Sequence, residues 1–393
     1  MKIDYIHYLV SEDTGRHHVR QFAKAAQALG HDLRERAMNL SPDGGGAAAG
    51  GSGGARSRLK RRFGRYLHDP KELLWNLRYA RREQELLAAD RPEVLLVRDH
   101  VLTASCLRVS RRLGLPLVLE MNSPAEEGTL YQDPYVHLPG VSAWLEGVKL
   151  RRADAVAVVS SRLRDYLVER HRVDPGKFVV APNGADLEVF KPGAPRDPGI
   201  PWDPSELPVV GFVGSFRKWH GVEHLGRMLQ EVGAVRPSAR FLMVGDGPEI
   251  DVTRRLAEPL GDRVIFTGRV PHARVPRLVA SFQIGVLPET LFYGSPLKMI
   301  EWMAAGKAVV APAYDPVREV MQDREEGLLF PPGDADAMIR AVLELVDDPA
   351  LRQRLGAAAA TRAATSLSWQ DNARKVLQGC SAALEKHRRS RPS

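Results

Sequence analysis

The sequence is poor in cysteine and in long apolar runs. Its 393 residues include two cysteines, Cys106 and Cys380, which stand far apart and form no metal-binding or redox motif. No run approaches the roughly 18 consecutive apolar residues of a membrane-spanning helix. The opening segment MKIDYIHYLV lacks the cleavage site of a signal peptide and is typical of a first strand. These absences predict free thiols and a cytoplasmic protein.

Two kinds of ligand motif are also missing. The run SPDGGGAAAGGSGGA at 41–55 contains no GxGxxG fingerprint and follows no predicted strand, which argues against an NAD-dependent oxidoreductase. Its low complexity predicts a flexible loop instead. No Asp-x-Asp pair stands in an apolar context. We therefore expect neither a metal ion nor a cofactor to hold the phosphates of a ligand.

The composition, with 44% apolar and 26% charged residues, is that of an ordinary globular protein, and the length favours two or three domains. Short apolar runs alternate with helical periodicity, which predicts an α/β fold of two doubly wound parallel sheets. A linker with six prolines separates them. We place the first domain at 1–191, the linker at 192–208 and the second domain at 209–370.

The densest pattern runs from Ile284 to Pro312. Two apolar runs, Ile284–Leu287 and Ala308–Ala311, predict neighbouring buried strands. Between them, Ser295-Pro296 is the pair expected at the N-cap and first turn of a helix. A helix that begins at the carboxyl end of a strand presents unpaired N–H groups to a phosphate. Glu301, further along this helix, offers a carboxylate to a sugar diol.

This stretch resembles the donor-site signature of retaining glycosyltransferases of family 4, which have the GT-B fold. The match consists of SPLK, then E, then MAAGKAVVAP. The resemblance implies two Rossmann-like domains facing an interdomain cleft and a nucleotide-sugar donor. It places the donor diphosphate at Ser295, Pro296, Leu297 and Lys298, and the ribose hydroxyls at Glu301. It also implies that the helix at 371–393 crosses back to the first domain.

The sequence departs from the family pattern at one position. The family has two glutamates eight positions apart, and the position eight before Glu301 is Tyr293. Glu289 lies nearby but out of register. We therefore leave the role of the first glutamate unassigned.

Two N-terminal segments extend the resemblance. Gly15 is what remains of a loop motif that usually has two glycines, and His17 or His18 either faces the cleft or begins a solvated helix. The predicted strand at 117–120 ends in Glu120, where family members often carry a histidine. Ligands bind at such strand ends in open α/β sheets, so we expect Glu120 near the acceptor or the reacting carbon. The alternative is a structural carboxylate.

The loop after the strand Pro208–Val213 predicts a second part of the donor site. Gly214 permits close backbone approach, and Arg217 with Lys218 precedes a helix start, an arrangement that suits a diphosphate. In the family, an arginine and a lysine in this loop stabilise the diphosphate as a leaving group. Their spacing is compressed here, so which residue takes which role stays open, and His220 is either a further phosphate contact or a structural turn residue.

Two more residues follow from the resemblance alone. In relatives, the backbone after the next strand pairs with the nucleotide base. This implies that Arg269 and Val270 lie beside the base in this chain.

A basic segment accounts for the excess charge. Between Arg56 and Arg82 there are ten Lys/Arg and two Asp/Glu, a difference of 10 − 2 = +8, and the whole chain also carries +8. A basic helix with Phe, Tyr and Trp is typical of a segment that lies on an anionic membrane surface. It is equally typical of a plain solvated surface, whereas the absence of nucleic-acid motifs argues against nucleic acid. We also expect Leu74 and Leu77 to face inward on a helix that begins at Asp69-Pro70.

Together these observations predict a metal-independent glycosyltransferase. It moves a sugar from a nucleotide sugar to a glycan or lipid-linked acceptor. Retention of configuration at the anomeric carbon is implied by the resemblance alone. Such work belongs to cell-surface polysaccharide, glycolipid or natural-product synthesis, in the cytoplasm or on the inner face of the membrane. A non-catalytic GT-B scaffold and a sugar-nucleotide epimerase are the alternatives.

Overall fold

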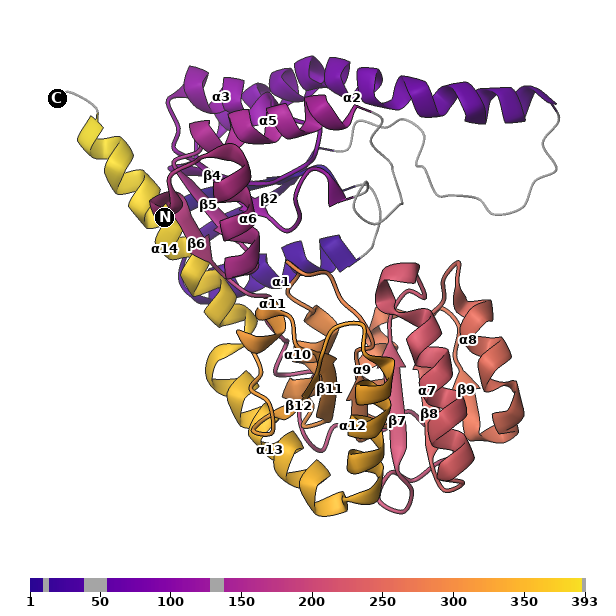
Figure 1. Ribbon diagram of the computed structural model, residues 1–393. Helices are drawn as coiled ribbons and strands as arrows, with labels where there is room; N and C mark the ends of the chain where they lie inside the picture. The colour runs from indigo at the N-terminus through magenta and orange to yellow at the C-terminus, as the bar shows by residue number, and fades with distance from the viewer. Residues whose placement is uncertain (10–13, 39–54, 128–137, 391–393) are drawn as a thin grey trace. The chain divides into compact units, whose positions relative to one another are not determined.

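The computed structural model describes residues 1–9, 14–38, 55–127 and 138–390, with backbone alone at 14–15 and 55–68 (Figure 1). The chain divides into two compact units. The first comprises Met1–Ala181 and Asn372–Ser393, and the second comprises Pro182–Asp371. Each unit contains one six-stranded parallel sheet.

The first sheet has the strand order β2-β1-β3-β4-β5-β6. Its strands are β1 Lys2–His7, β2 Asp32–Ala37, β3 Val94–Arg98, β4 Leu117–Met121, β5 Ala155–Val158 and β6 Phe178–Val180. The helices are α1 Thr14–Ala28, α2 Ala55–Ala89, α3 Ser105–Leu113, α5 Pro139–Arg152 and α6 Ser161–His171. The last helix of the chain, α14 Trp369–Ser390, belongs to this unit from Asn372 onward. The order reverses between β1 and β3, so the carboxyl ends of these strands border a natural ligand position.

The second sheet has the order β12-β11-β10-β7-β8-β9 and reverses between β7 and β10. Its strands are β7 Val209–Val213, β8 Arg240–Val244, β9 Val264–Phe266, β10 Ile284–Val286, β11 Ala308–Pro312 and β12 Gly327–Phe330. The helices are α7 Val222–Val235, α8 Ile250–Ala257, α9 Val275–Ala280, α10 Leu297–Ala304, α11 Asp315–Arg318, α12 Ala335–Asp347 and α13 Pro349–Ser366. Short 3-10 turns precede some of them, among them η2 Lys218–His220 and η4 His272–Arg274.

Alternate residues of the second sheet enter two separate apolar cores. Phe212 and Phe241 pack with α7 and α12 on one face, whereas Val209 and Leu242 pack with α9, α10 and α13 on the other. Side chains that alternate between two buried faces are what a parallel sheet covered by helices on both sides requires. The prediction of two doubly wound parallel sheets is confirmed.

The sequence prediction missed β2. This strand lies at the edge of its sheet and has the sequence DLRERA, in which only Leu33 is buried. Charged side chains on an edge strand hide the apolar alternation on which strand prediction depends.

The prediction for α2 was wrong in two respects. One helix runs through Pro70, so Asp69 is not an N-cap, and its buried carboxylate accepts a hydrogen bond from Leu138 N at 2.7 Å. Leu74 and Leu77 are 68% and 63% exposed instead of facing inward. The buried stripe of α2 consists of Tyr79, Ala80, Glu83 and Leu87. Packing of this stripe against α3 and the first sheet turns the two leucines to solvent.

The unit boundary falls at Ala181/Pro182, ahead of the PNGAD run, and the residues from Asn372 onward group with the first unit. The glycine-rich segment lies almost wholly outside the described residues, as do the side chains of 56–68 in the basic segment. Among the helices of the described chain, none is long and apolar enough to cross a membrane.

Candidate functional site

The loops at the reversal of the second sheet bring several predicted residues together. The loop after β7 contains Gly214 and Arg217, and η2 leads into Gly221, which precedes α7 with a left-handed φ of +66°. The loop after β10 leads to α10. Because both loops leave the carboxyl ends of adjacent parallel strands, their side chains meet at one edge of the sheet.

Lys298, in the first turn of α10, reaches across to the loop after β7. Its Nζ lies 3.0 Å from Nε2 of His220 and 5.1 Å from the centre of the Phe212 ring. A Cβ on Gly214 would stand 2.8 Å from this Nζ, so a side chain larger than glycine would displace the ammonium group. Lys298 therefore occupies a defined position beneath the loop.

The contacts of His220 fix its tautomer. Its Nδ1 bonds to the carbonyl of Ser215, which can only accept, so Nδ1 carries the proton. Nε2 is then an acceptor for the Lys298 ammonium. Burial and the neighbouring Lys298 lower the pKa of His220 to about 3, so the ring is neutral in the physiological range.

Burial also acts on the two ionisable groups of α10. It lowers the pKa of Lys298 to about 7, although Glu301 opposes this shift. It raises the pKa of Glu301 to about 8, with Lys298 opposing and Asp186 adding to the rise. Glu301 is 6% exposed. Both groups are held close to their neutral forms, and an oppositely charged or hydrogen-bonding ligand would shift either one.

Helix α10 begins one residue later than predicted. The N-cap of α10 is Pro296, and the Ser295 hydroxyl accepts from Asn183 N at 3.0 Å without capping the helix. The Asn183 side-chain amide donates to the Ser295 carbonyl at 2.8 Å. Because proline has no side-chain acceptor, no side chain caps α10, and the amides of Leu297 and Lys298 start the helix.

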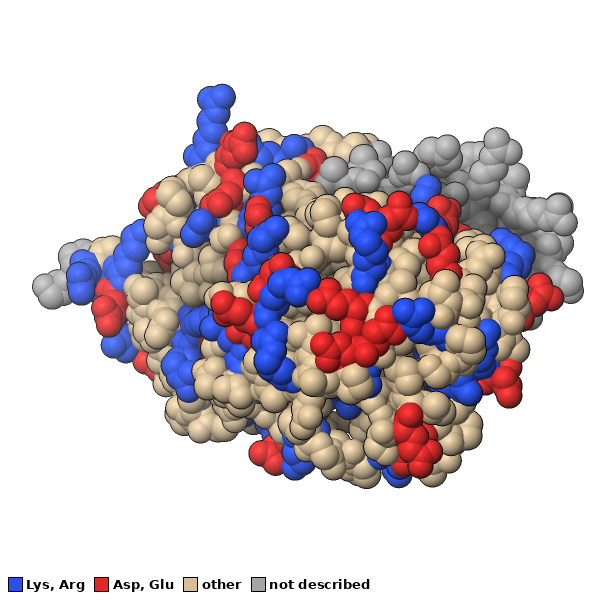
Figure 2. Space-filling model, turned by 60° about the horizontal axis from the view of Figure 1, so that its bottom comes forward, with Lys and Arg blue, Asp and Glu red and all other residues tan. Residues whose placement is uncertain are grey.

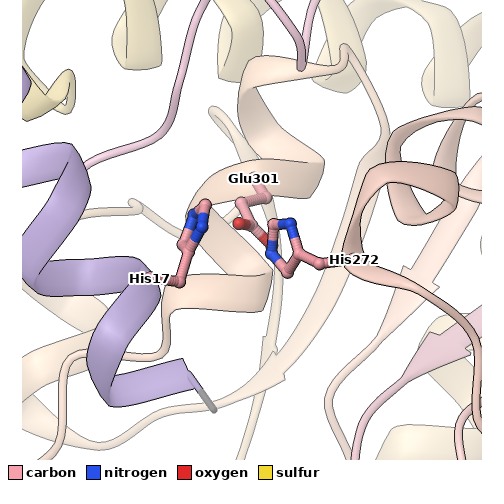
Figure 3. Close-up of side chains that lie close together, drawn as sticks. All are labelled: His17, His272 and Glu301. Carbon is pink, nitrogen blue, oxygen red and sulfur yellow. The ribbon is translucent and has the colours of Figure 1, made fainter. Parts of the chain in front are cut away.

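Glu301 has a second neighbour in the same unit. Figure 3 shows the side chains of His272, from η4, and Glu301, from α10, pointing toward each other, and their ligand atoms lie within 4.8 Å. Burial lowers the pKa of His272. His17, also labelled in Figure 3, belongs to α1 of the first unit. His272 and Glu301 are two candidate metal ligands from the second unit. A catalytic zinc site has three protein ligands, so this pair alone does not make one.

The remaining predicted residues of this unit are more exposed. Arg217 is half-buried with its guanidinium 5.0 Å from the centre of the Trp219 ring, whereas Lys218 is exposed at the start of η2. Arg269 is exposed after β9, and Val270 packs against the core beneath it. The structure thus pairs His220 with Lys298 and keeps Arg217 within electrostatic reach of His220, and it leaves Lys218 at the surface.

Tyr293, which stands where the family has its first glutamate, is buried in the core. Tyr293 is fully buried and packs edge-on against Phe292, with ring centres 5.0 Å apart. Glu289 instead lies at the carboxyl end of β10, where a Cβ on Gly221 would stand 2.9 Å from its own Cβ. The backbone at Glu289 thus lies against the end of the loop after β7, and its carboxylate accepts a hydrogen bond from Thr290 N at 2.9 Å.

Glu120 behaves as a structural carboxylate and not as a free reactive group. It is 5% exposed, and its Oε1 lies 2.6 Å from Arg98 Nη1, 2.8 Å from His18 Nε2 and 2.9 Å from Asn122 Nδ2. The Tyr5 hydroxyl donates to its Oε2. Burial disfavours its charge, but His18 and Arg98 outweigh burial and hold its pKa well below the usual range.

The arrangement around Glu120 favours the alternative interpretation, a carboxylate paired with Arg98. His18, one of the two histidines whose direction was open, contacts this carboxylate and is buried. Gly15 lies in the first turn of α1 and not in the preceding loop, because the helix begins at Thr14. Sequence reasoning missed the pairing of His220 with Lys298, since the two residues stand far apart in the chain and no local pattern links them.

Two family models match the chain. Residues 15–189 match Glycosyltransferase Family 4, and residues 207–348 match Glycosyl transferases group 1. The chain therefore contains a Glycosyltransferase Family 4 domain followed by a Glycosyl transferases group 1 domain. These two matches run through both units and include every predicted site residue.

Among curated proteins, this glycosyltransferase is 28% identical over 276 residues to alpha-D-kanosaminyltransferase of Streptomyces kanamyceticus, covering 66% of this chain and 69% of that protein. It is 32% identical over 225 residues to 2-deoxystreptamine N-acetyl-D-glucosaminyltransferase of Streptomyces fradiae, covering 54% and 52%. The chain thus spans between half and about two thirds of the length of these relatives.

Solved structures show the same architecture. Sucrose-phosphate synthase from Thermosynechococcus elongatus matches with a TM-score of 0.72 and 21% identity, covering 96% of this glycosyltransferase and 97% of that chain. Anabaena HepE in complex with UDP matches with a TM-score of 0.69 and 17% identity, covering 97% and 100%. The fold is GT-B, as the resemblance implied.

Proposed function

We propose that the protein transfers a sugar from a nucleotide-sugar donor to an acceptor hydroxyl. The observation that carries this proposal is the contact of Lys298 with His220 at the N-terminus of α10, which no side chain caps, at the reversal of the second sheet. The family match and the names of the relatives support it. HepE, whose fold this chain shares, was solved with UDP and with UDP-glucose.

The donor diphosphate would lie against Lys298 and the first amides of α10. Glycosyl transfer leaves a negative charge on the departing diphosphate, and preorganised donors that face this charge lower the barrier. Lys298 is held there by His220 Nε2 at 3.0 Å, and Arg217 adds a planar guanidinium on the adjacent loop. We propose these groups in place of the predicted pair of Arg217 with the exposed Lys218.

Protonation of Lys298 is coupled to this role. A pKa of about 7 leaves part of the lysine neutral in the empty site near neutral pH. A diphosphate within reach would raise that pKa, because an opposite charge favours the ammonium form. Binding would therefore take up a proton at pH 7.5, and the bound lysine would carry the charge that stabilises the leaving group.

Glu301 would accept hydrogen bonds from the ribose hydroxyls. It is buried, one turn along α10 from Lys298, with His272 beside it. Its pKa of about 8 means that the empty site holds the carboxyl group largely protonated at pH 7. The backbone around Arg269 and Val270, after β9, remains our proposal for the base. We propose that no metal ion takes part, since the cations already present suit the phosphates.

The acceptor side is proposed to lie in the first unit, with a glycan or lipid-linked acceptor. Leu74 and Leu77 on α2 and Trp144 on α5 are more than 60% exposed, and Lys71 on α2 lies over the Trp75 ring at 4.7 Å. Exposed apolar side chains next to cations are typical of contact with an anionic membrane surface. This favours peripheral association over a plain solvated helix.

A calorimetric titration with UDP, GDP and ADP tests the donor site. We expect one of them to bind the wild-type protein with uptake of a proton at pH 7.5, read from buffers of different ionisation enthalpy. Lys298→Met should weaken binding by about 1.5–3 kcal/mol, the range for hydrogen bonds to charged groups, and should abolish the uptake.

The parent nucleoside is the matched ligand control, since it lacks the diphosphate. Its affinity should be the same for the wild type and for Lys298→Met. Unchanged diphosphate affinity in Lys298→Met would remove the lysine from the site. No binding of any nucleotide would favour a non-catalytic scaffold instead.

A further inference from the structure

The first unit has a hollow lined by arginines that the donor site does not explain. It lies between α3 and the end of α5, and its volume is about 580 Å³. Its lining residues are Ala104, Leu107, Arg108, Arg111, Arg112 and Arg152. Four of these six residues are cations and none is acidic.

The spacing on α3 explains how the hollow arises. Arg108, Arg111 and Arg112 stand at positions i, i+3 and i+4, which share one face of a helix. Leu107 is 8% exposed and forms an apolar floor beside Ala104. Arg152 joins from the last turn of α5. Two separate helices therefore present guanidinium groups to the same space.

These four arginines lack the carboxylate partners that several other surface arginines have. In the described part of the chain, none of the four takes part in a hydrogen bond or ion pair of its side chain with a carboxylate. By contrast, Arg196, Arg227, Arg236 and Arg254 of the second unit each pair with an exposed carboxylate. Figure 2 shows a face of the molecule where acidic and basic side chains are interspersed in this way.

Helix dipoles do not account for the cluster. Basic residues near the end of a helix complement its negative end, and Arg111, Arg112 and Arg152 occupy last turns. However, the end of α3 already has another cation, because Arg91 donates to the carbonyl of Leu113 at 2.5 Å. Arg108 lies in the first half of α3, far from that end. Four like charges in one hollow repel one another unless an anion joins them.

We propose that this hollow binds a phosphate group, at a site separate from the donor diphosphate. Arginine offers a planar fork of donors that matches phosphate oxygens in pairs, and Leu107 with Ala104 can contact the carbon atoms attached to the phosphate. The group can belong to a soluble phosphate ester or to the headgroup of an anionic lipid. The side chains are the same for both sources. The proposal does not depend on the donor site.

The experiment compares one phosphate ester from two sources. Glycerol 3-phosphate is titrated in solution, and phosphatidylglycerol vesicles, with phosphatidylcholine vesicles as the neutral blank, are tested by co-sedimentation. The variant replaces Arg108, Arg111, Arg112 and Arg152 by Gln. The matched control replaces Arg196, Arg227, Arg236 and Arg254 by Gln, which changes the net charge equally.

We expect the wild type to bind one of the two probes. The hollow variant should lose at least tenfold in affinity, since a single arginine near an anionic surface is worth about fivefold. The control variant should lose less than threefold. Binding of glycerol 3-phosphate identifies a soluble ester, and binding of the vesicles alone identifies a lipid headgroup.

Equal losses in the two variants would overturn the proposal, because general charge would then explain them. Absence of binding to both probes would overturn it as well. A second variant with Lys at the four hollow positions tests the proposal even if the Gln variant fails to fold. It keeps the charge but loses the paired donors, so it should bind more weakly than the wild type and more tightly than the Gln variant. Thermal unfolding confirms that every variant is folded.

Discussion

Glu120 in the first unit and Glu301 in the second are buried glutamates near the carboxyl edge of a sheet. Their surroundings shift the pKa of the two carboxylates in opposite directions. Glu120 lies within 2.9 Å of three donor groups, from Arg98, His18 and Asn122, and its pKa is held low. The described residues provide no such set of donors to Glu301, and burial raises its pKa to about 8. A carboxylate saturated by the protein holds the fold together, whereas one left dehydrated and poorly paired is available to a ligand.

The comparison corrects an inference from strand position alone. Glu120 lies near the carboxyl end of β4, and Glu301 lies in α10, the helix that follows β10. Ligands bind at this edge of open α/β sheets. Position therefore predicts where a site lies but not which side chain serves it. The contacts of each carboxylate decide that question, and they favour Glu301 over Glu120.

The largest effect is expected from Glu120→Gln. Loss of the charge leaves Arg98, whose side chain is 14% exposed, without its counter-charge, and it weakens the contact with His18, whose side chain is 7% exposed. Removing one partner of a buried pair costs about 3–5 kcal/mol. Urea unfolding at pH 7 should show this loss. Because the folded pKa of Glu120 is low, its contribution is present above the unfolded pKa and disappears in acid, so the gap to the wild type should close as the pH falls below about 4.

Glu301→Gln is the matched change at the other glutamate. Its stability relative to the wild type should rise with increasing pH, whereas that of Glu120→Gln should fall. Between about 4.5 and 8 the folded protein keeps the Glu301 proton while the unfolded chain loses it. The wild type therefore loses stability as the pH rises through this window, by up to about 1.4 kcal/mol for each pH unit. Glu301→Gln does not titrate, so its stability relative to the wild type should increase from pH 5 to pH 8.

Thermal unfolding of both proteins across this range measures the difference. Lys298 is present in both, so its own titration largely cancels. A constant difference between the two proteins would mean that Glu301 ionises normally, and the contrast with Glu120 would then fail.

The smallest effect is expected from Asn122→Ala. Its amide is one of the donors to Glu120 Oε1, at 2.9 Å, and it carries no charge. A neutral hydrogen bond contributes about 0.5–1.5 kcal/mol, and Arg98 and His18 remain in place. The urea midpoint should shift slightly and the slope should stay unchanged. A loss as large as that in Glu120→Gln would show that the Asn122 amide, and not Arg98 and His18, stabilises the carboxylate.

Most of the fold could be predicted from the sequence. The predicted strands Ile284–Leu287 and Ala308–Ala311 match β10 and β11 to within one residue, because a buried parallel strand is continuously apolar and short. Edge strand β2 was missed because only one of its side chains is buried. Leu74 and Leu77 were misplaced because a helix with apolar residues on more than one side does not reveal which side packs.

The site was only partly predictable. Glu301, Lys298 and Arg217 stood in motifs that resemble a known family, so their proximity to the same sheet edge could be anticipated. The bond between His220 and Lys298 could not, since it joins residues 78 positions apart. The saturation of Glu120 was equally hidden, because its donors come from β1, α1, β3 and the residue after β4.

One titration tests the central claim most directly. The nucleoside diphosphate that binds the wild type is titrated by calorimetry into Glu301→Gln and Glu120→Gln, under conditions where both variants are folded. At pH 9, where Glu301 is ionised, we predict a loss of at least about tenfold in affinity for Glu301→Gln, the lower limit for a hydrogen bond to a charged group, and no change for Glu120→Gln. Unchanged affinity in Glu301→Gln, or an equal loss in the two variants, would contradict the assignment of the donor site to the second unit.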